Sequence, residues 1–349
     1  MQHDDRQHDD RQHDDTQADD RQRDATPPES AEATEDVLGA PFTRETIDLG
    51  SDREGPVTAT LVKAPTHGPT NAAVLYVHGF CDYFFQKHFA QWWTDRGYTF
   101  YAIDLRKYGR SLADHQSPNH VEDLSEHFPE LDEAYRRITQ RDGHEAVVVA
   151  GHSTGGLIVP LWLHEHRPAV AGVVLNSPWL DMQGGWIMRN PATALIKQWG
   201  ALRPRDVLPR SVSGVYGRSI HRSVQGEWEF NTDWKPLDSF PARTGWLAAV
   251  RRGHDQVHTG LDVRAPVLVL SSSRSTTPDD VDEDAMSTDT VLDVTQIRRW
   301  ATSLGPHVTS VAIDGAMHDI VLSREPVRDA AMDQIGAWLR TYVEDAAAT

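Results

Sequence analysis

One serine in this sequence lies in a pattern that could make it a nucleophile. Residues 151–155 read Gly-His-Ser-Thr-Gly and stand between the apolar, β-branched residues 147–149 and the apolar residues 157–159. A G-x-S-x-G turn between a buried strand and a helix holds its serine in a strained backbone conformation that exposes the hydroxyl. The glycines are needed because the helix and the strand pass too close for a Cβ atom. Ser153 is therefore the candidate nucleophile, and the alternative is a glycine-rich turn with a bystander serine.

A serine hydroxyl needs a general base, and the base needs an orienting acid. The chain has 18 histidines. His318 is the candidate base because it follows the last predicted strand, residues 308–313, in a loop at the carboxyl edge of the sheet near Ser153. The alternative is that His318 is an ordinary histidine of a surface loop.

The orienting acid is expected after the preceding strand, residues 266–270, where the loop is rich in carboxylates. Asp289 is the first candidate because it stands just ahead of a predicted helix, residues 294–304. Asp293 is the second candidate, with an alternative role as the N-cap of that helix. If neither is the acid, it lies among the earlier carboxylates of the loop, which are Asp279, Asp280, Asp282, Glu283 and Asp284.

The elements that must hold these residues alternate between strands and helices. Strands are predicted at residues 46–49, 58–63, 72–77, 98–105, 147–149, 170–175, 266–270 and 308–313, and helices at 85–96, 124–138, from 157 onward, 294–304 and 327–343. Such alternation predicts an α/β fold whose sheet is mostly parallel and carries helices on both faces. In such sheets ligands bind at the carboxyl ends of the strands, where the candidate residues converge.

Three regions follow from the pattern. Residues 1–36 form an acidic, low-complexity segment with a Gln-His-Asp-Asp-Arg repeat and no aromatic residue, which predicts a disordered tail. Residues 37–178 and 263–349 form the α/β core. The alternation stops between them, at residues 179–262, which hold six of the 11 tryptophans and are predicted to form a largely helical cap over the strand ends.

Charge and composition narrow the possible partners and surroundings. The formal net charge is −18, and half of it lies in residues 1–36, so the remainder is acidic too. This argues against nucleic acid and anionic membranes as partners. Weak binding of transition metals by the histidine repeat is less favoured than a solvated tail. Cys81 is the single cysteine, which rules out an intrachain disulfide. No signal sequence or membrane span is recognised, so cytoplasmic residence is expected.

Taken together, the motifs resemble the α/β-hydrolase superfamily, within its serine aminopeptidase and monoacylglycerol lipase-like branch, often labelled lysophospholipase. The candidate order of serine, acid and histidine is the one that this superfamily uses. The resemblance spans about residues 45–345, departing from the family at residues 107–108 (Lys-Tyr where Gly-His is common) and in the acidic stretch before Asp289. The matching motifs are His78-Gly79-Phe80, Asp104-Leu105-Arg106, Gly109-Arg110-Ser111, residues 151–156 and residues 315–319.

This resemblance implies a catalytic triad of Ser153, Asp289 and His318, with an oxyanion hole formed by the backbone N–H groups of Phe80 and Thr154. No metal and no organic cofactor are expected. Asp104 and Arg106 are expected to brace the loop that follows their strand, Cys81 to be a small buried residue, and His152 to point away from the site along the turn.

The expected activity is hydrolysis of carboxylic esters through an acyl-enzyme on Ser153. The tryptophan-rich cap predicts a small-molecule ester with an apolar group as substrate. One alternative is an aminopeptidase or amidase, which would need an acidic group for a free amine, with Glu227, Asp233 and Asp238 as candidates in the cap. The other is a ligand-binding protein without catalysis on the same scaffold. The oligomeric state is left open.

Overall fold

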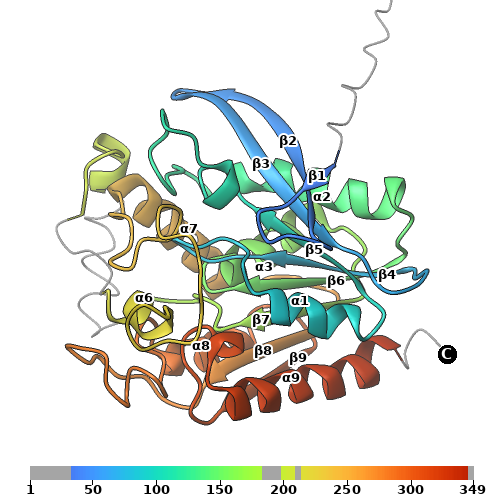
Figure 1. The fold of residues 1–349 in the computed structure, drawn as a ribbon. Coiled ribbons are helices and arrows are strands. Elements are labelled where there is room, and N and C mark those ends of the chain that lie inside the picture. The colour runs from blue at the N-terminus through green and yellow to red at the C-terminus, as the bar shows by residue number, and fades with distance from the viewer. Residues whose placement is uncertain (1–32, 183–197, 209–213, 345–349) are drawn as a thin grey trace, which may run out of the picture. The chain divides into compact units, whose positions relative to one another are not determined.

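A nine-stranded sheet forms the centre of the molecule (Figure 1). The computed structural model describes residues 33–182, 198–208 and 214–344. The strand order is β1-β2-β3-β5-β4-β6-β7-β8-β9. The strands are β1 (Thr34–Glu35), β2 (Thr43–Asp52), β3 (Gly55–Ala64), β4 (Ala72–Val77), β5 (Thr99–Asp104), β6 (Ala146–His152), β7 (Gly172–Asn176), β8 (Val267–Ser272) and β9 (Val308–Ile313).

Most of the sheet is parallel, which confirms the predicted fold class. The strands from β5 through β4, β6, β7 and β8 to β9 pair in parallel, each with its neighbour. At the other edge, β1, β2 and β3 pair in antiparallel fashion, and β3 pairs antiparallel with β5. Because β4, β6, β7, β8 and β9 all point the same way, the loops after them meet at one edge of the sheet.

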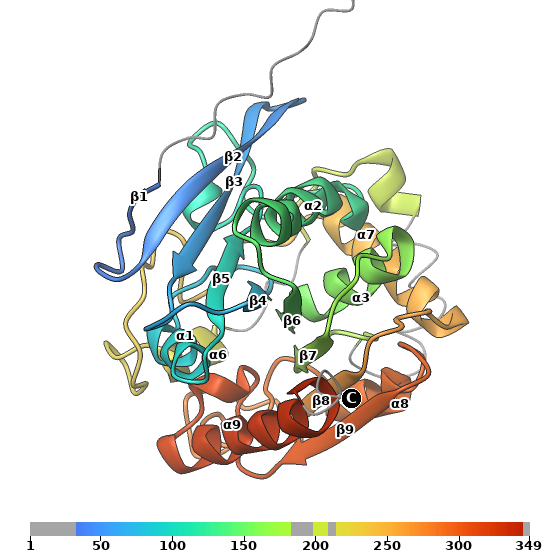
Figure 2. The same cartoon turned by 90° about the vertical axis from the view of Figure 1, so that its right-hand side faces the viewer.

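Helices cover both faces of the sheet, as Figure 2 shows. In β6 the alternate residues Val147 and Val149 face one apolar cluster and Val148 and Ala150 face the other, which is the period of two of a buried strand. The first cluster includes residues of α2 (Phe128–Arg136), α3 (Gly155–His166), α7 (Thr244–Thr259) and α8 (Val294–Ala301), and the second includes residues of α1 (Lys87–Thr94) and α9 (Glu325–Leu339).

The predicted tail extends too far into the fold and must be corrected. Thr34 and Glu35 form β1, which pairs with Arg44 and Thr43 of β2. Asp36 is only 3 % exposed and accepts hydrogen bonds from the Arg110 guanidinium at 2.7 and 2.8 Å. Residues 33–36 therefore belong to the folded body, because Thr34 and Glu35 pair with β2 and Asp36 is held by Arg110, 74 residues later. The prediction for residues 1–32 falls outside the described residues.

The predicted helix limits are also adjusted. The helix predicted at residues 85–96 is shorter, since α1 covers Lys87–Thr94. The segment predicted as one helix at residues 124–138 begins with a 3₁₀ turn (Leu124–His127), continues as α2 and ends in a π-helical turn (Arg137–Arg141).

The described part of residues 179–262 contains helices and isolated β-bridges, but no strand of the sheet. It includes the short helix α6 (Val215–Ile220) and the longer α7. Trp246, Ala249 and Val250 of α7 are buried in the same apolar cluster as α3. We therefore assign α7 to the helix layer of the sheet, which leaves the residues before it as the cap. Residues 183–197 and 209–213 of the predicted cap lie outside the described residues.

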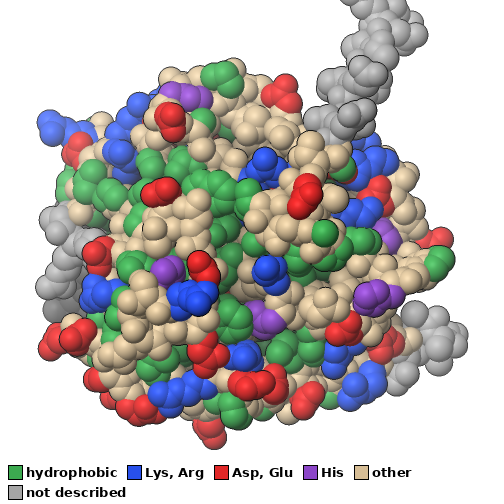
Figure 3. Space-filling model, viewed as in Figure 1, with side chains coloured by type: hydrophobic (Ala, Val, Ile, Leu, Met, Phe, Trp, Pro, Cys, Tyr) green, Lys and Arg blue, Asp and Glu red, His purple; other side chains and the backbone are tan. Residues whose placement is uncertain are grey.

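Acidic and basic side chains are intermixed on the face of the molecule that Figure 3 shows, rather than gathered by sign. Ion pairs of the described residues include Arg324 with Glu283 and Arg328 with Glu227. None of the helices in the described part of the chain is long and apolar enough to cross a membrane.

Candidate active site

Ser153 occupies the sharp turn between β6 and α3. Its φ of 52° lies in the left-handed region, which a non-glycine residue adopts only when the surroundings hold it there. The flanking glycines are required by close approach. A Cβ atom on Gly155 would lie 2.4 Å from the carbonyl oxygens of Val77 and His78, and one on Gly151 would lie 2.8 Å from the carbonyl oxygen of Gly155. The predicted reason for these glycines is therefore confirmed.

The three predicted triad side chains meet in one hydrogen-bonded chain. The Nε2 atom of His318 lies 2.9 Å from Ser153 Oγ, and its Nδ1 atom lies 3.0 Å from Asp289 Oδ2. Ser153 is 7 % exposed, His318 2 % and Asp289 0 %. With the proton on Nδ1 donated to the carboxylate, Nε2 is free to accept the serine proton, which is the arrangement that general base catalysis needs.

The loop before α8 decides which carboxylate faces His318. Asp289 Oδ1 accepts hydrogen bonds from the backbone N–H groups of Val291 and Leu292 at 2.8 and 2.7 Å, which turns Oδ2 toward the histidine. Asp293 instead accepts from the backbone N–H of Thr295 at 3.0 Å and is the N-cap of α8. The structure thus places both aspartates where the sequence reasoning placed them, in two different local roles.

The two residues expected to supply oxyanion donors, Phe80 and Thr154, lie at the cavity that Ser153 lines. Phe80 follows β4, and Thr154 follows Ser153 at the N-cap of α3. Within the described residues, neither N–H donates to a protein acceptor outside regular helices and strands, and both residues line the same cavity as Ser153. The N-terminus of α3 adds a partial positive charge at this point. An oxygen that gains negative charge next to Ser153 would find suitable donors here.

A cavity of about 830 Å³ opens at these groups. One part of its wall is apolar, and another part carries the polar side chains of Asp82, Tyr216 and Lys235. Of the cap tryptophans, Trp179 lines the cavity, together with Trp246 of α7, whereas Trp199 is exposed and Trp186 lies outside the described residues. The main apolar side chains of the wall are Phe80, Trp179, Met182, Leu208, Trp246, Leu247, Val291 and Leu292.

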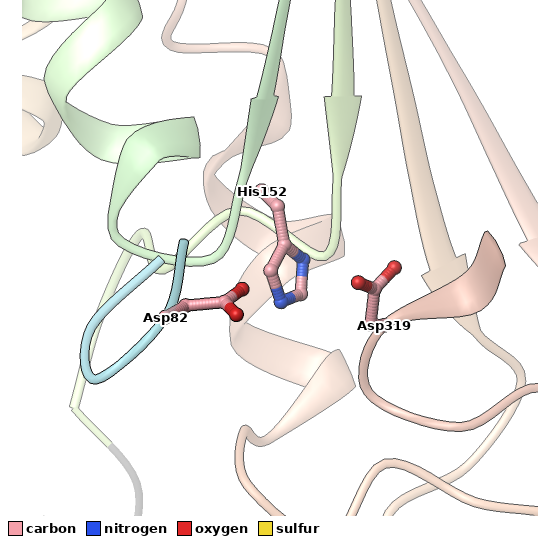
Figure 4. Close-up of side chains that lie close together, drawn as sticks. All are labelled: Asp82, His152 and Asp319. Atoms are coloured by element: carbon pink, nitrogen blue, oxygen red, sulfur yellow. The ribbon is translucent and has the colours of Figure 1, made fainter. Parts of the chain in front are cut away.

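A second group of ionisable side chains includes His152, the residue directly before Ser153 (Figure 4). One ligand atom each of Asp82, His152 and Asp319 lies within 4.8 Å of the others, a spacing that a metal ion could bridge. The carboxylates of this group already have partners within the protein, however. The Lys235 ammonium lies 2.8 Å from Asp82, and Asp319 accepts from Asn176 at 2.6 Å. A cation would be repelled by that ammonium, so these residues fit a buried polar network better than a metal site.

Three further groups were not singled out for the site by sequence reasoning. Asp82 follows a strand end and could have been found from that place in the pattern. Lys235 and Tyr216 belong to the cap and carry no local signal. The ring of Tyr216 stands edge-on to that of His318, with centroids 5.4 Å apart.

The departure from the family pattern at Lys107 has a structural reason. The residue has φ of 65°, a value that glycine adopts more easily, and its ammonium lies 2.5 Å from Asp52 and 2.8 Å from Glu54. Burial alone would raise the pKa of Glu54, but hydrogen bonds from Lys107 and Ser117 outweigh it and lower that pKa to about 2. These ion pairs hold the loop after β5 against the β2–β3 turn.

The predicted brace of the same loop is confirmed for both residues. Asp104 accepts hydrogen bonds from the backbone N–H groups of Phe84 and Arg110, both at 3.0 Å. Arg106 pairs with the buried carboxylate of Glu130 at 2.8 Å.

Comparisons with known proteins give a family and a similar protein. The family model described as serine aminopeptidase, S33 matches residues 68–325. The phospholipase YtpA of Bacillus subtilis is 24 % identical over 280 residues, which cover 78 % of this chain and 96 % of that protein.

Two solved structures share the fold. A soluble variant of the monoglyceride lipase of Saccharomyces cerevisiae aligns with a TM-score of 0.63 at 15 % identity, covering 86 % of this chain and 95 % of that one. The monoacylglycerol lipase of Paleococcus ferrophilus aligns with a TM-score of 0.60 at 22 % identity, covering 81 % and 99 %.

Proposed function

The chain belongs to the serine aminopeptidase S33 family, on an α/β-hydrolase fold, and we propose that it cleaves carboxylic esters through an acyl-enzyme on Ser153. The predicted family resemblance is thereby confirmed. The observation that carries the proposal is the hydrogen-bonded chain from Ser153 through His318 to Asp289 at the wall of the cavity.

In the proposed mechanism, His318 Nε2 takes the hydroxyl proton of Ser153 while the oxygen attacks the ester carbonyl carbon. The carbonyl oxygen becomes an oxyanion and accepts hydrogen bonds from the N–H groups of Phe80 and Thr154. His318 then gives the proton to the departing alcohol. In the second half, it takes a proton from water, which attacks the acyl-enzyme, and it returns that proton to Ser153 Oγ as the acid is released. Asp289 keeps the imidazole oriented and stabilises its cationic form.

The cavity supports an ester with an apolar acyl group. Its apolar wall, built around Trp179, Leu208 and Trp246, would remove such a group from water next to the nucleophile. The names of two similar proteins, a phospholipase and a monoacylglycerol lipase, are in keeping with this wall.

An aminopeptidase activity is less well supported, because a free amine needs an uncommitted carboxylate near the serine. Among the described residues, Asp82 and Asp293 are the acids that line the cavity, and they are paired with Lys235 and the N-terminus of α8. Of the cap acids, Glu227 pairs with Arg328 and Asp238 with Arg218, and Asp233 is exposed.

The proposal is tested with paired substrates. We expect the purified protein to hydrolyse p-nitrophenyl esters, with kcat/KM rising from acetyl to medium-chain acyl groups, and to leave amino-acid p-nitroanilides nearly untouched. A fluorophosphonate probe should label Ser153 alone, as mapped by peptide mass spectrometry. Preference for the anilides would favour the aminopeptidase, and no turnover with no labelling would favour a ligand-binding protein.

A further inference from the structure

The loop that carries the Phe80 N–H, residues 80–83, is unusual in its backbone. Cys81 has φ of 50°, in the left-handed region, although it is not a glycine. Such a conformation persists only where surrounding contacts hold it. The contacts that hold this loop therefore also decide where the Phe80 N–H points.

Many of these contacts come from one segment of the cap, residues 231–240, which we call the clamp segment. The backbone N–H of Asn231 donates to the Tyr83 hydroxyl at 2.7 Å, and the backbone N–H of Phe240 donates to Cys81 Sγ at 3.2 Å. Between them, the Lys235 ammonium donates to Asp82 Oδ1 at 2.8 Å. Three consecutive residues of the loop are thus held by the same stretch of chain.

The ion pair at the centre of this contact is buried. The side chain of Asp82 is 3 % exposed and that of Lys235 is 8 % exposed. The ammonium also lies within 6 Å of the ring centroids of Phe85, Tyr216 and Phe230, which exclude water from it. Burial alone would raise the pKa of Asp82, but the charge of Lys235, its hydrogen bond and the nearby imidazoles together outweigh burial and hold that pKa below its ordinary value. Removing one partner would leave the other charge buried and unpaired, which is strongly destabilising.

Asp82 also lies beside the nucleophile turn. Figure 4 shows its carboxylate pointing toward the ring of His152, the residue directly before Ser153. A shift of Asp82 would therefore disturb both the loop of Phe80 and the packing around His152.

We propose that the Asp82–Lys235 ion pair is a positioning element, through which the clamp segment holds the Phe80 N–H in place for the oxyanion. This inference rests on the proposed function, since it assigns that N–H to the oxyanion hole. Loss of the pair lets the loop relax from the backbone conformation at Cys81, and the donor leaves its place. Binding of the apolar acyl group depends on other walls of the cavity and is expected to change less.

The single cysteine of the chain supplies a reporter that does not depend on catalysis. Cys81 lies in the positioned loop and is 6 % exposed, and burial raises the pKa of its thiol. A thiol reagent such as Ellman's reagent should react slowly with the native protein and faster when the loop is released. We expect Lys235→Met to raise this reaction rate by about tenfold or more.

The kinetic test uses the same variant. Lys235→Met should lower kcat for a p-nitrophenyl ester by about 10- to 100-fold, less than the full loss of an oxyanion donor, with KM changed by less than about threefold. In the double variant Asp82→Asn/Lys235→Met no charge is left unpaired, so its kcat should exceed that of Lys235→Met. Glu227→Gln is the matched control, because Glu227 joins the cap to Arg328 of α9 through an ion pair whose carboxylate is exposed. Its kcat and thiol reactivity should stay within about twofold of the wild type.

Several results would overturn the proposal. One is a Lys235→Met variant with kcat and thiol reactivity within twofold of the wild type. Another is a double variant whose fold-reduction in kcat equals the product of the fold-reductions of Asp82→Asn and Lys235→Met. If Lys235→Met does not fold, Asp82→Asn is tested instead. A kcat reduced about threefold or more supports the proposal, and an unchanged kcat contradicts it. A wild type that cleaves no ester refutes the proposed function, whereas the thiol rates still report on the positioning of the loop.

Discussion

Two histidines of this protein lie side by side but have different hydrogen-bond partners. The ring centroids of His318 and His152 are 4.9 Å apart, and each ring is close to aspartate side chains. His318 joins Asp289 on one side to the Ser153 hydroxyl on the other. His152 instead donates through Nδ1 to the carbonyl oxygen of Asn176 at 3.1 Å, between Asp82 and Asp319.

The difference lies in the partners of the carboxylates. One carboxylate oxygen of Asp289 accepts hydrogen bonds from two backbone N–H groups, and the other faces His318. The carboxylates near His152 are held by other side chains, Asp82 by Lys235 and Asp319 by Asn176 and Gln86. A histidine next to an acid is therefore poised for catalysis only when the acid is directed at it and its second nitrogen meets a nucleophile.

The largest effect is expected for Ser153→Ala, which removes the hydroxyl that His318 contacts in the hydrogen-bonded series Ser153–His318–Asp289. We expect kcat to fall by roughly six orders of magnitude, as for the serine of other triads, with the melting temperature nearly unchanged because the hydroxyl packs against little else. Esterase assays and thermal melts check this. Residual turnover near the wild-type level would mean that another residue is the nucleophile.

The next effect separates Asp289, the acid next to His318, from Asp319, an acid near His152. Asp289→Asn should lower kcat by about 10⁴-fold, since an amide at this place favours the wrong histidine tautomer. Asp319→Asn is the matched change near His152 and should cost less than about tenfold. Steady-state kinetics on both variants, with circular dichroism as the control for folding, decides between them. Equal losses would show that the two groups act as one.

The third effect concerns acid stability. Burial foremost, with the charges of His318 and Lys235 nearby, lowers the pKa of His152. The unfolded chain takes up a proton at His152 near pH 6.5, whereas the folded chain does not, so this residue contributes stability that is lost as the pH falls below about 6.5. His152→Gln should therefore reduce the loss of unfolding free energy between pH 7.5 and 5.5, as measured by urea denaturation. An unchanged loss in the variant would indicate that His152 is protonated in the folded protein.

The smallest effect is expected at Asp293, the alternative acid. Because its carboxylate caps α8, Asp293→Ala should cost about 1 kcal/mol of unfolding free energy and leave kcat within about threefold. Chemical denaturation and esterase assays on the same preparation check both parts. A loss of activity as large as that of Asp289→Asn would transfer the orienting role to Asp293.

Much of the scaffold was predictable from local patterns. The strands at residues 72–77 and 308–313 match β4 and β9 at both ends. β4 is a buried parallel strand, which the sequence shows as a short apolar run, whereas β9 lies at the edge of the sheet and is only partly buried. The turn at Ser153 needs glycines whatever else surrounds it. Helix ends were less accurate, as α1 shows, because the frayed turns at helix termini depend on their neighbours.

By itself, the sequence determined the strand–turn–helix unit that presents Ser153, the parallel order of the strands that follow, and the loop that carries His318. These features depend on residues close together in the chain, whose conformational preferences act locally. The choice between Asp289 and Asp293 was different, because both precede the same helix and only the hydrogen bonds of the folded loop turn one of them toward His318.

Only the tertiary structure decided the contacts between distant segments. Asp36 belongs to the fold because Arg110 lies opposite it, 74 residues later, and Asp82 is held by Lys235, 153 residues later. No local preference encodes such a pair, since a lone aspartate or lysine is ordinarily a solvated surface residue. Burial away from water makes these charges partners. For Asp82 and Lys235 that burial arises only when the cap docks on the loop after β4.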